Sequence, residues 1–362
     1  MSELQNAREL INKVDKEMVR LFEIRMDAAK TVAEYKKENG LPVDDVEREK
    51  EIIEKNSNCI ENEEYRSYYV NFLKNNIKLS KDLQHRLLEG MTVAYSGVEG
   101  AFANIAAQRI FPDARCLPYT DFKAAYKAVE DGECDCVILP IENSFNGDVG
   151  TVLDLAFFGS LYINGVYEAE VIQNLLGTKD STISDIKTVV SHPQALGQCA
   201  RFIENHGFET ENFVNTAVAA KTVAEKGDKS VAAIGSKEAA ERFGLQVLSE
   251  KINDSSMNTT RFAVFSRSKK TPSINDDRFI MMFTVKNAAG SLGEAISVIG
   301  QHSFNLRALK SRPTKQLVWD YFFYVEGEGN INSSQGMEML KQLEHCCSDL
   351  KIIGCYEKEI NI

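Results

Sequence analysis

The sequence predicts a multidomain protein with an all-α module, an α/β domain and a small α+β domain, in that order. Apolar residues recur at helical spacing over residues 4–38, which indicates one long helix. Between residues 92 and 266, short apolar runs alternate with helical segments, as is typical of an α/β sheet domain. Beyond a polar linker at 269–278 the pattern becomes βαββαβ. A chain of 362 residues is also too long for one ordinary core.

The first domain is expected to hold three helices joined by short loops, within residues 1–90, at 4–38, 46–55 and 63–88. The first helix ends at Gly40, a residue type favoured just past a helix C-terminus. Asp44 and Glu47 resemble a capping box that opens the second helix.

The two later domains are expected at 91–268 and 279–362. In the α/β domain, strands are predicted at 92–95, 136–140, 187–191, 230–234 and 261–266, with helices at 122–130 and 217–224. In the C-terminal domain, the βαββαβ elements are predicted at 279–285, 292–301, 306–311, 319–326, 334–347 and 350–356.

Composition and charge exclude several kinds of partner. No apolar run approaches the length of a membrane span, and the first residues have no apolar stretch of the secretory kind. The net charge of −11 argues against nucleic acid, because polyanion binding needs a broad basic surface. A small anionic substrate needs only a few inward-pointing cations. The eight cysteines lack metal-type spacing and indicate reduced thiols, so we expect a cytoplasmic protein.

Basic residues on the first helix suggest an anion site. Arg25 and Lys36 are eleven residues apart, so they share a helix face at a separation of roughly 16 Å. Long side chains leaning together could grip a small anion. Arg8 precedes Arg25 by roughly 26 Å of helix and cannot touch the same ligand within one protomer. If Arg8 belongs to the site, a second copy supplies it, which predicts an intertwined dimer.

The sequence around these residues resembles that of a known family. The segments ARELINKVDKEMVRLFEIRMDAAKTVAEYKK and PVDDVEREKEII closely resemble the helical chorismate mutase domain, over roughly residues 1–90. The resemblance implies that the substrate is bound by Arg8, Arg25, Lys36, Asp45, Arg48, Glu49, Ser80 and Gln84. It implies that Lys36 and Gln84 donate to the breaking ether oxygen of chorismate, and that Glu49 holds a hydroxyl or a proton.

The chemistry of that reaction explains the residue types. Chorismate rearranges without acid, base or covalent help, so the enzyme must fold the substrate and stabilise developing charge. Arginines suit its two carboxylates because they bind them bidentately. Taken singly, each of these residues has a structural alternative. Most helix cations are solvated, Asp45 could cap the second helix, and Ser80 could be a surface serine.

The α/β domain resembles prephenate dehydratase over about residues 91–268. The resemblance rests on the segments AYSGVEGAFANIAA, LPIENSFNGDVGTVLDL, SHPQALGQC, AAIGSKEAAERFGLQVL and NTTRFAVF. It implies two lobes with the active site in the cleft between them, and a catalytic Thr260. A threonine hydroxyl is a weak acid, so its position must matter more than its pKa when it assists departure of the ring hydroxyl.

Other cleft residues are expected at the ends of strands. Asn143 and Ser144 follow one strand, and Ser191, His192 and Gln198 follow the next; we expect all five to bind substrate. His192 precedes a proline and could equally be a capping residue. Arg261 either holds a substrate carboxylate or forms a salt bridge to a neighbouring strand. A further candidate is the glycine turn at 97–100, whose amides could cradle an anion, whereas Glu142 and Asn146 are left without a role.

The C-terminal domain resembles the ACT domain, a βαββαβ module that binds amino acids between two protomers. Its two signatures appear here in variant form, as Gly290-Ser291-Leu292 and as Lys310-Ser311-Arg312-Pro313, with lysine at 310 where the family has glutamate. Small residues at 290 and 291 let backbone amides approach a ligand carboxylate. The resemblance implies a regulatory site for phenylalanine. The alternative is a ferredoxin-like dimerisation module without a ligand.

Together the resemblances imply a bifunctional enzyme that turns chorismate into prephenate and prephenate into phenylpyruvate, under feedback by L-phenylalanine. Neither reaction requires a metal or an organic cofactor, and we expect none. The expected partners are the two substrates, the effector and further copies of the chain, in a dimer or tetramer. One alternative is a dehydratase that prefers arogenate. Another is a non-catalytic amino-acid sensor, against which the intact Thr260 and the basic constellation argue.

Overall fold

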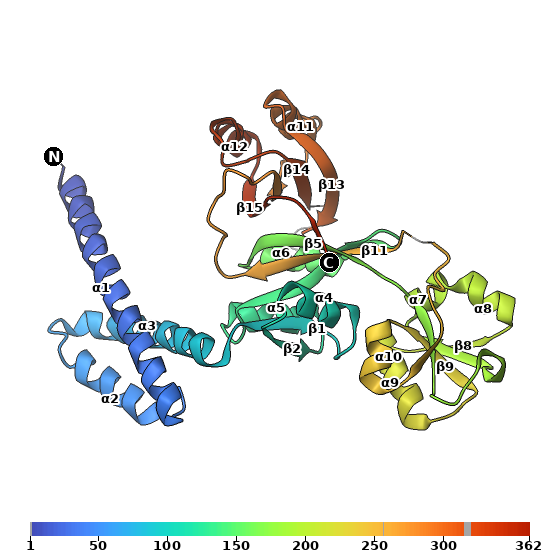
Figure 1. Cartoon of the computed structure of the whole chain (residues 1–362). Helices are drawn as coiled ribbons and strands as arrows, with labels where there is room; N and C mark the ends of the chain where they lie inside the picture. Colours follow the sequence, from blue (N-terminus) through green and yellow to red (C-terminus); the bar gives the residue numbers. More distant parts are fainter. Residues whose placement is uncertain (1, 256, 315–319) are drawn as a thin grey trace. The chain divides into compact units, whose positions relative to one another are not determined.

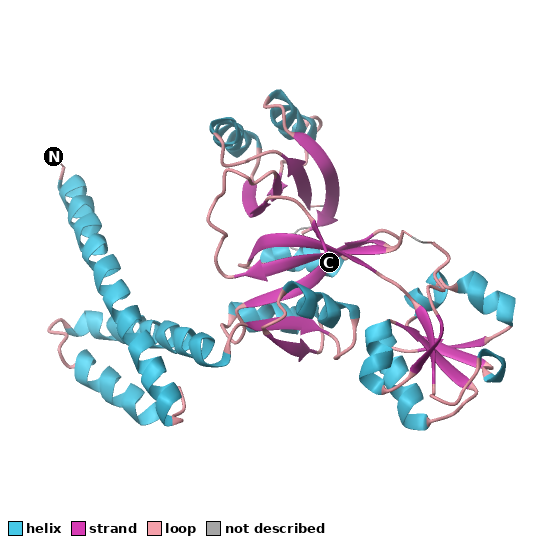
Figure 2. Ribbon diagram, viewed as in Figure 1, coloured by secondary structure: helices cyan, strands magenta, loops and turns pink. Residues whose placement is uncertain are grey.

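The computed structural model describes residues 2–255, 257–314 and 320–362, and the chain divides into two compact units, Met1–Met91 and Thr92–Ile362. The first unit is helical, and the second holds all the strands that the structure describes (Figure 1, Figure 2). Within the described ranges, no helix combines the length and the apolar character needed to cross a membrane.

The helical unit consists of α1 (Glu3–Asn39), α2 (Val46–Ser57) and α3 (Glu63–Glu89). Helix α1 ends at Gly40, which has φ 64° and donates its N–H to carbonyls of the last turn, as predicted. The predicted capping box at Asp44 is wrong by one residue. Asp45 is the N-cap of α2, and its carboxylate accepts the Arg48 N–H at 3.0 Å. The Asp44 carboxylate instead binds Lys81.

The apolar side chains of α1 are only partly buried. The buried apolar side chains of this unit are few and include Ala29 and Ala33 of α1 and Leu73 and Ile77 of α3, two helices in contact. Most of the apolar stripe that predicted α1 is exposed, and it includes Leu10, Ile11, Val14, Met18, Leu21 and Phe22. A contiguous apolar face of this kind marks an interaction surface. The unit therefore does not complete its own core.

The second unit begins with a mixed sheet that we call the first lobe. Its strand order is β2 (Arg115–Tyr119), β1 (Thr92–Ser96), β3 (Cys136–Asn143), β11 (Thr259–Ser266), β5 (Tyr162–Glu170), and the short β4 (Gly147–Asp148) pairs with β3. Strand β1 is parallel to both neighbours, and β11 is antiparallel to both of its own. The helices of this lobe are α4 (Phe102–Ile110), α5 (Phe122–Glu130) and α6 (Gly150–Phe158).

The second lobe is a separate sheet of five strands. Their order is β10 (Gln246–Ser249), β6 (Asn174–Gly177), β9 (Val231–Gly235), β7 (Thr188–Ser191), β8 (Glu209–Asn212). The helical segments of this lobe are η1 (Ile183–Asp185), α7 (Pro193–Gln198), α8 (Ala200–His206), α9 (Thr216–Lys226) and α10 (Lys237–Phe243). The chain enters this lobe after β5 and returns at β11, so two neighbouring strands of the first lobe carry both connections (Figure 1).

The C-terminal part has the predicted βαββαβ order, with β12 (Arg278–Thr284), α11 (Ser291–Gln301), β13 (Asn305–Pro313), β14 (Tyr321–Glu328), α12 (Ser334–Cys346) and β15 (Asp349–Tyr356). Trp319, at the start of a predicted strand, lies outside the described residues. The strand order β13-β14-β12-β15 continues into β5, so these strands extend the sheet of the first lobe. A final strand, β16 (Ile360–Asn361), also pairs with β5.

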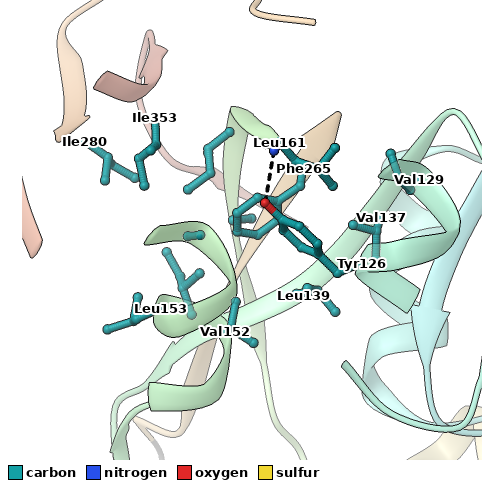
Figure 3. Close-up of a cluster of buried hydrophobic side chains, with 14 of the residues drawn as sticks. Tyr126, Val129, Val137, Leu139, Val152, Leu153, Leu161, Phe265, Ile280 and Ile353 are labelled. Carbon is teal, nitrogen blue, oxygen red and sulfur yellow. Dashed lines mark hydrogen bonds between the residues drawn. The ribbon is translucent and has the colours of Figure 1, made fainter. Parts of the chain in front are cut away.

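Strand β12 is buried on both faces, which explains its continuous apolar run. Phe279, Met281 and Phe283 contribute to a core with α11 and α12. Ile280 and Met282 contribute to the core of the first lobe, alongside Phe265, Leu161 and Tyr126 (Figure 3). Ring stacking between Phe157 of α6 and Phe322 of β14, at 4.1 Å, belongs to the same contact. The first lobe and the C-terminal part thus share one hydrophobic core.

A hydrogen bond inside this core should be measurable by mutation. The Leu161 N–H donates to the Tyr126 hydroxyl at 3.0 Å, and both residues are fully buried (Figure 3). In Tyr126→Phe that buried N–H loses its acceptor, so we expect the free energy of unfolding to fall by about 1–3 kcal/mol. Urea denaturation would measure it. Tyr95→Phe is the control, since Tyr95 is as little exposed as Tyr126 but does not belong to this core cluster. Equal stability of the two variants would contradict the prediction.

Candidate active sites

In the helical unit, residues of α1 and α3 meet at one candidate site. The Arg25 guanidinium donates to Ser80 Oγ at 2.5 Å, and the Ser80 hydroxyl is 3.0 Å from the Asn76 carbonyl. Gln84 lies one turn beyond Ser80, and both side chains are buried. Gln84 Oε1 has no hydrogen-bond partner among the described residues. A buried amide with unused bonding capacity is suited to a polar ligand.

A cation that the sequence analysis missed also belongs to this region. Lys81 Nζ lies 2.8 Å from Glu49 Oε1 and 2.5 Å from Asp44 Oδ1. The hydrogen bond to Asp44, followed by that to Glu49, raises the pKa of Lys81, and Lys81 in turn lowers the pKa of Asp44. Lys36 of α1 donates to the Val43 carbonyl at 2.6 Å. Lys81 follows Ser80 directly, but a lone lysine on a polar helix gives no signal in the sequence.

Three residues of the helical unit that were predicted to bind substrate are not part of the contacts described above. Arg8 is exposed in the first half of α1, far along the helix from Arg25. Asp45 caps α2, and Arg48 forms an exposed ion pair with Glu51 at 2.6 Å. Asp45 therefore caps α2, the role that the sequence left open as an alternative to substrate binding.

In the second unit, the two lobes border a cavity of about 410 Å³. Thr260 and Asn143 line it from β11 and β3, where they are directly paired. Asn143 Nδ2 donates to Thr260 Oγ1 at 2.9 Å, and Asn143 Oδ1 accepts the N–H groups of Phe145 and Asn146. Because Thr260 Oγ1 accepts from Asn143, its own proton is left to donate; no acceptor for it exists among the described residues. Asn143 thus orients the threonine hydroxyl.

Of the other predicted residues, Gln198 and His192 line the cavity, and two serines do not. His192 is the N-cap of α7, with Nδ1 3.2 Å from the Gln194 N–H, so it has the capping role as well. Ser191 is fully buried, and its hydroxyl donates to the Ile234 carbonyl at 2.7 Å. The Ser144 hydroxyl donates to the Met257 carbonyl at 2.7 Å. We assign both serines a structural role in place of substrate binding.

Two amides of the expected anion cradle at the glycine turn are engaged within the protein. Gly97 and Gly100 have φ values of 108° and 86°, which only glycine adopts readily. Their amides, however, donate within the protein, to the Tyr119 carbonyl at 2.8 Å and to Asn104 Oδ1 at 3.0 Å. The turn therefore shapes the chain entering α4, and it does not present these amides to a ligand.

Several lining residues were missed. Asn215 and Thr216 open α9, where Asn215 Oδ1 accepts the Val218 N–H at 2.7 Å. Gln173 lies in the connection from β5 to β6; its Nε2 is 3.3 Å from Gln198 Oε1, and its buried Oε1 has no partner within the described part of the chain. Asn215 before a helical run is an N-cap signal that the sequence does contain. The sequence contains no comparable signal for Gln173.

Arg261 has the salt-bridge surroundings that the sequence left open as an alternative to substrate binding. It follows Thr260 in β11, so its side chain points to the opposite face of the sheet, and it is not among the described residues that line the cavity. Its guanidinium binds both oxygens of Glu326, at 3.0 and 2.8 Å, and Glu142 at 2.9 Å. Burial lowers the pKa of Arg261, but the hydrogen bonds and charge of Glu326 outweigh burial and raise it. We withdraw Arg261 from the substrate-binding residues.

The two signature segments of the C-terminal part belong to different elements, α11 and β13. Gly290 is the N-cap of α11, with φ 89°, and Ser291 and Leu292 begin that helix. Ser311, Arg312 and Pro313 end β13. The Arg312 guanidinium binds Asp154 of α6 at 2.6 and 3.0 Å, and Lys310 binds carboxylates of the first lobe. Both cations of this signature are therefore engaged with the first lobe.

Similarity to known proteins covers nearly the whole chain. Residues 93–270 match the prephenate dehydratase family, and residues 7–85 match the chorismate mutase type II family. The chain is 31% identical to the bifunctional chorismate mutase/prephenate dehydratase of Aquifex aeolicus, over 99% of both chains. It is 32% identical to arogenate dehydratase/prephenate dehydratase 1 of Arabidopsis thaliana, over 74% of this chain and 72% of that protein.

A solved structure agrees with these relatives. Prephenate dehydratase from Arthrobacter aurescens, in complex with L-Phe, is 28% identical, covers 74% of this chain and 90% of its own, and superposes with a TM-score of 0.69.

The ion pairs around Glu142 predict how stability depends on pH. Burial raises the pKa of Glu142, but hydrogen bonds from Lys310 and Arg261 outweigh it and hold the pKa below the ordinary 4.5. A lowered carboxyl pKa stabilises the fold above the ordinary value, and this stabilisation is lost as pH falls through the lowered value. We expect the free energy of unfolding to decline below about pH 4.5, and less steeply in Glu142→Gln. Urea titrations at several pH values measure this. Glu338→Gln, on the exposed face of α12, should keep the wild-type slope; equal slopes in all three proteins would contradict the prediction.

Proposed function

The chain belongs to the family of bifunctional chorismate mutases/prephenate dehydratases, and we infer that it converts chorismate to prephenate and prephenate to phenylpyruvate, in phenylalanine biosynthesis. The observation that carries this conclusion is the order of the two matched domains, 7–85 and 93–270, together with 31% identity to a bifunctional enzyme over nearly the full length. The two reactions are consecutive, since the product of the first is the substrate of the second.

We propose that the mutase site lies in the helical unit, around Arg25, Lys36 and Gln84. The rearrangement breaks the ether C–O bond and forms a C–C bond without a proton transfer, so the protein has to compress the substrate and stabilise charge on the oxygen. Arg25 would bind a carboxylate, while Lys36 and Gln84 would donate to the ether oxygen. Glu49, whose Oε1 lies 2.8 Å from Lys81 Nζ, would accept a hydrogen bond from the substrate hydroxyl.

The helical unit is proposed to act as a dimer. The exposed apolar stripe of α1 supports a second copy, because such a face is stable only when covered. Arg8 lies on the same helix, roughly 26 Å from Arg25. In an antiparallel arrangement of two copies of α1, Arg8 of one protomer would approach the site of its partner. The eight free thiols suit the reducing cytoplasm, which we propose as the location.

In the dehydratase site, Thr260 is proposed to donate its proton to the departing ring hydroxyl, which leaves as water. The C–C bond to the ring carboxylate breaks in the same process, carbon dioxide leaves, and its electron pair completes the aromatic ring. The threonine regains a proton from solvent. Asn143 supports this role because its amide donates to Thr260 Oγ1 and so aims the hydroxyl proton away. Positioning of this kind compensates for a weak acid.

The substrate carboxylates are proposed to bind amide groups in this site. The described residues that line the cavity include no lysine or arginine. Their polar groups include the amides and hydroxyl of Gln173, Gln198, Asn215 and Thr216. The N-terminus of α9 adds its partial positive charge, which favours an anion. The unpartnered Gln173 Oε1 is suited to accept a hydrogen bond from the substrate hydroxyl.

We propose that the C-terminal part is an ACT-type domain that binds phenylalanine. Its βαββαβ order and the glycine at the start of α11 support this assignment, as does the bacterial relative in complex with L-Phe. Gly290, Ser291 and Leu292 would bind the effector carboxylate, together with the segment Ser311 to Pro313. Inhibition requires that phenylalanine bind one arrangement of the dehydratase lobes better than another. Arogenate remains the second candidate substrate, because a plant relative carries both activities in its name.

The test of the dehydratase proposal compares neighbouring threonines. Thr260→Val keeps the side-chain shape and removes the proton donor, so we expect kcat for phenylpyruvate formation to fall by about 10²–10⁴-fold. Thr260→Ser should retain much of it, and Thr259→Val is the adjacent control. Incubation with chorismate, with and without phenylalanine, follows prephenate and phenylpyruvate together; parallel assays with arogenate decide the substrate. Full dehydration in Thr260→Val, or its loss in Thr259→Val alone, would refute the role of Thr260.

The mutase proposal is tested with a similar pair. Lys36→Met removes the proposed donor to the ether oxygen, and we expect kcat for prephenate formation to drop by about 10²–10³-fold. Lys37→Met removes a charge from the next, exposed position of α1 and should leave the rate unchanged. Dehydration of added prephenate reports that both variants are folded in the second unit. Equal mutase rates for the two methionine variants would exclude Lys36 from the site.

A further inference from the structure

The two strands that carry the proposed dehydratase residues present a second pair of side chains on their other face. Thr260 is paired with Asn143, and the next pair along the two strands is Arg261 with Glu142. Consecutive side chains of a strand point to opposite faces. Thr260 and Asn143 line the cavity, whereas Arg261 contacts Glu326 and Glu142 contacts Lys310, both in the C-terminal part. One peptide bond separates each member of the first pair from its neighbour in the second.

On that other face, Arg261 is held by a carboxylate of the C-terminal part. Both oxygens of Glu326, in β14, accept from the guanidinium, and only 3% of Glu326 is exposed. The Tyr324 hydroxyl also donates to Glu326, at 2.5 Å. A buried carboxylate with these partners has little freedom to move unless the guanidinium moves with it.

Lys310 makes the corresponding contact with the other strand. Its Nζ lies 2.9 Å from Glu142 Oε1 and 2.5 Å from Asp148 Oδ1, and 15% of its side chain is exposed. A glutamate here would face Glu142 and Asp148 with like charge. Lys310 therefore joins the proposed effector segment to the strand that ends in Asn143.

We propose that Lys310 is a positioning residue, which, through an ion cluster of Lys310, Glu142, Asp148, Arg261 and Glu326, transmits the state of the C-terminal domain to Asn143 and Thr260. The effector half of this inference rests on the proposed binding of phenylalanine. Lys310 directly precedes Ser311, so an effector that shifts the end of β13 also shifts the Lys310 ammonium. Glu142 moves with the Lys310 ammonium because the two are paired. Asn143 is next to Glu142 in β3, so the amide that orients the Thr260 hydroxyl moves as well. Coupling arises because the cluster fits one arrangement better than the other.

The experiment uses the full chain and three variants. Lys310→Met removes the charge at similar length, Lys310→Arg keeps it, and Lys341→Met removes an exposed charge elsewhere in the same domain, on α12. Three quantities are measured for each protein: kcat and KM for prephenate, the Kd of phenylalanine by calorimetry, and the phenylalanine concentration that halves dehydration. The mutase rate and a thermal unfolding curve report folding.

For Lys310→Met we expect a dehydratase kcat at least about three-fold lower, because the hydroxyl donor is less well positioned. The phenylalanine Kd should stay within about two-fold, while the half-inhibiting concentration rises at least about five-fold. Lys310→Arg should restore both quantities, and Lys341→Met should match the wild type. Unchanged kcat and inhibition in Lys310→Met would overturn the inference. Loss of phenylalanine binding in that variant would overturn it too, since Lys310 would then be part of the effector site.

The failure of the proposed effector function has a different signature. If the wild-type protein neither binds nor responds to phenylalanine, the regulatory proposal is wrong. The link from Lys310 to Thr260 is then decided by kcat alone. A loss in Lys310→Met that Lys310→Arg restores would support the link, and a wild-type kcat would refute it.

Discussion

Side-chain alternation in the antiparallel pair of β3 and β11 is the constraint on which the second unit depends. One face of this pair presents Asn143 and Thr260 to the cavity, so it must be polar and open to a ligand. The other face presents Glu142 and Arg261, whose charges are tolerated there only because carboxylates and cations of the C-terminal part surround them. The two faces therefore share one stretch of backbone.

The hydrophobic packing also uses the two faces of one strand for different purposes. The FIMMF run of β12 contributes alternate residues to two cores, one with its own helices and one with the first lobe. A βαββαβ fold by itself leaves one sheet face open to solvent, and here Phe322 and its neighbours are covered by α6. Because β15 also pairs with β5, the C-terminal part shares one sheet with the first lobe and is not a tethered attachment. The helical unit is the opposite case, since its apolar α1 stripe is left uncovered within one chain.

Element types were predictable wherever periodicity was strong. The boundaries of α1, α5 and α12 differ from those expected by one residue at most, because amphipathic periodicity, and for α1 the terminal Gly40, carry clear local signals. Strand β5 was missed, although it is central to the sheet. Its sequence YINGVYEAE mixes a glycine with charged and polar residues, and only the pairing with β11 and β15 makes those positions extended. Local propensity cannot anticipate a strand that tertiary pairing imposes.

The sequence by itself determined the order of the domains, because element types and linkers follow local patterns along the chain. Its motifs also carry the resemblance that implied the two catalytic chemistries and the proposed role of Thr260. The tertiary structure decided where each charge points. Arg261 follows Thr260 in sequence but lies on the other face of the sheet, and its partner Glu326 is 65 residues away. Lys81 and Lys310 likewise bind carboxylates that are distant in the sequence, those of Glu49 and Glu142. An ion pair is a property of three-dimensional proximity, and no spacing along the chain encodes which distant carboxylate will lie beside a given cation.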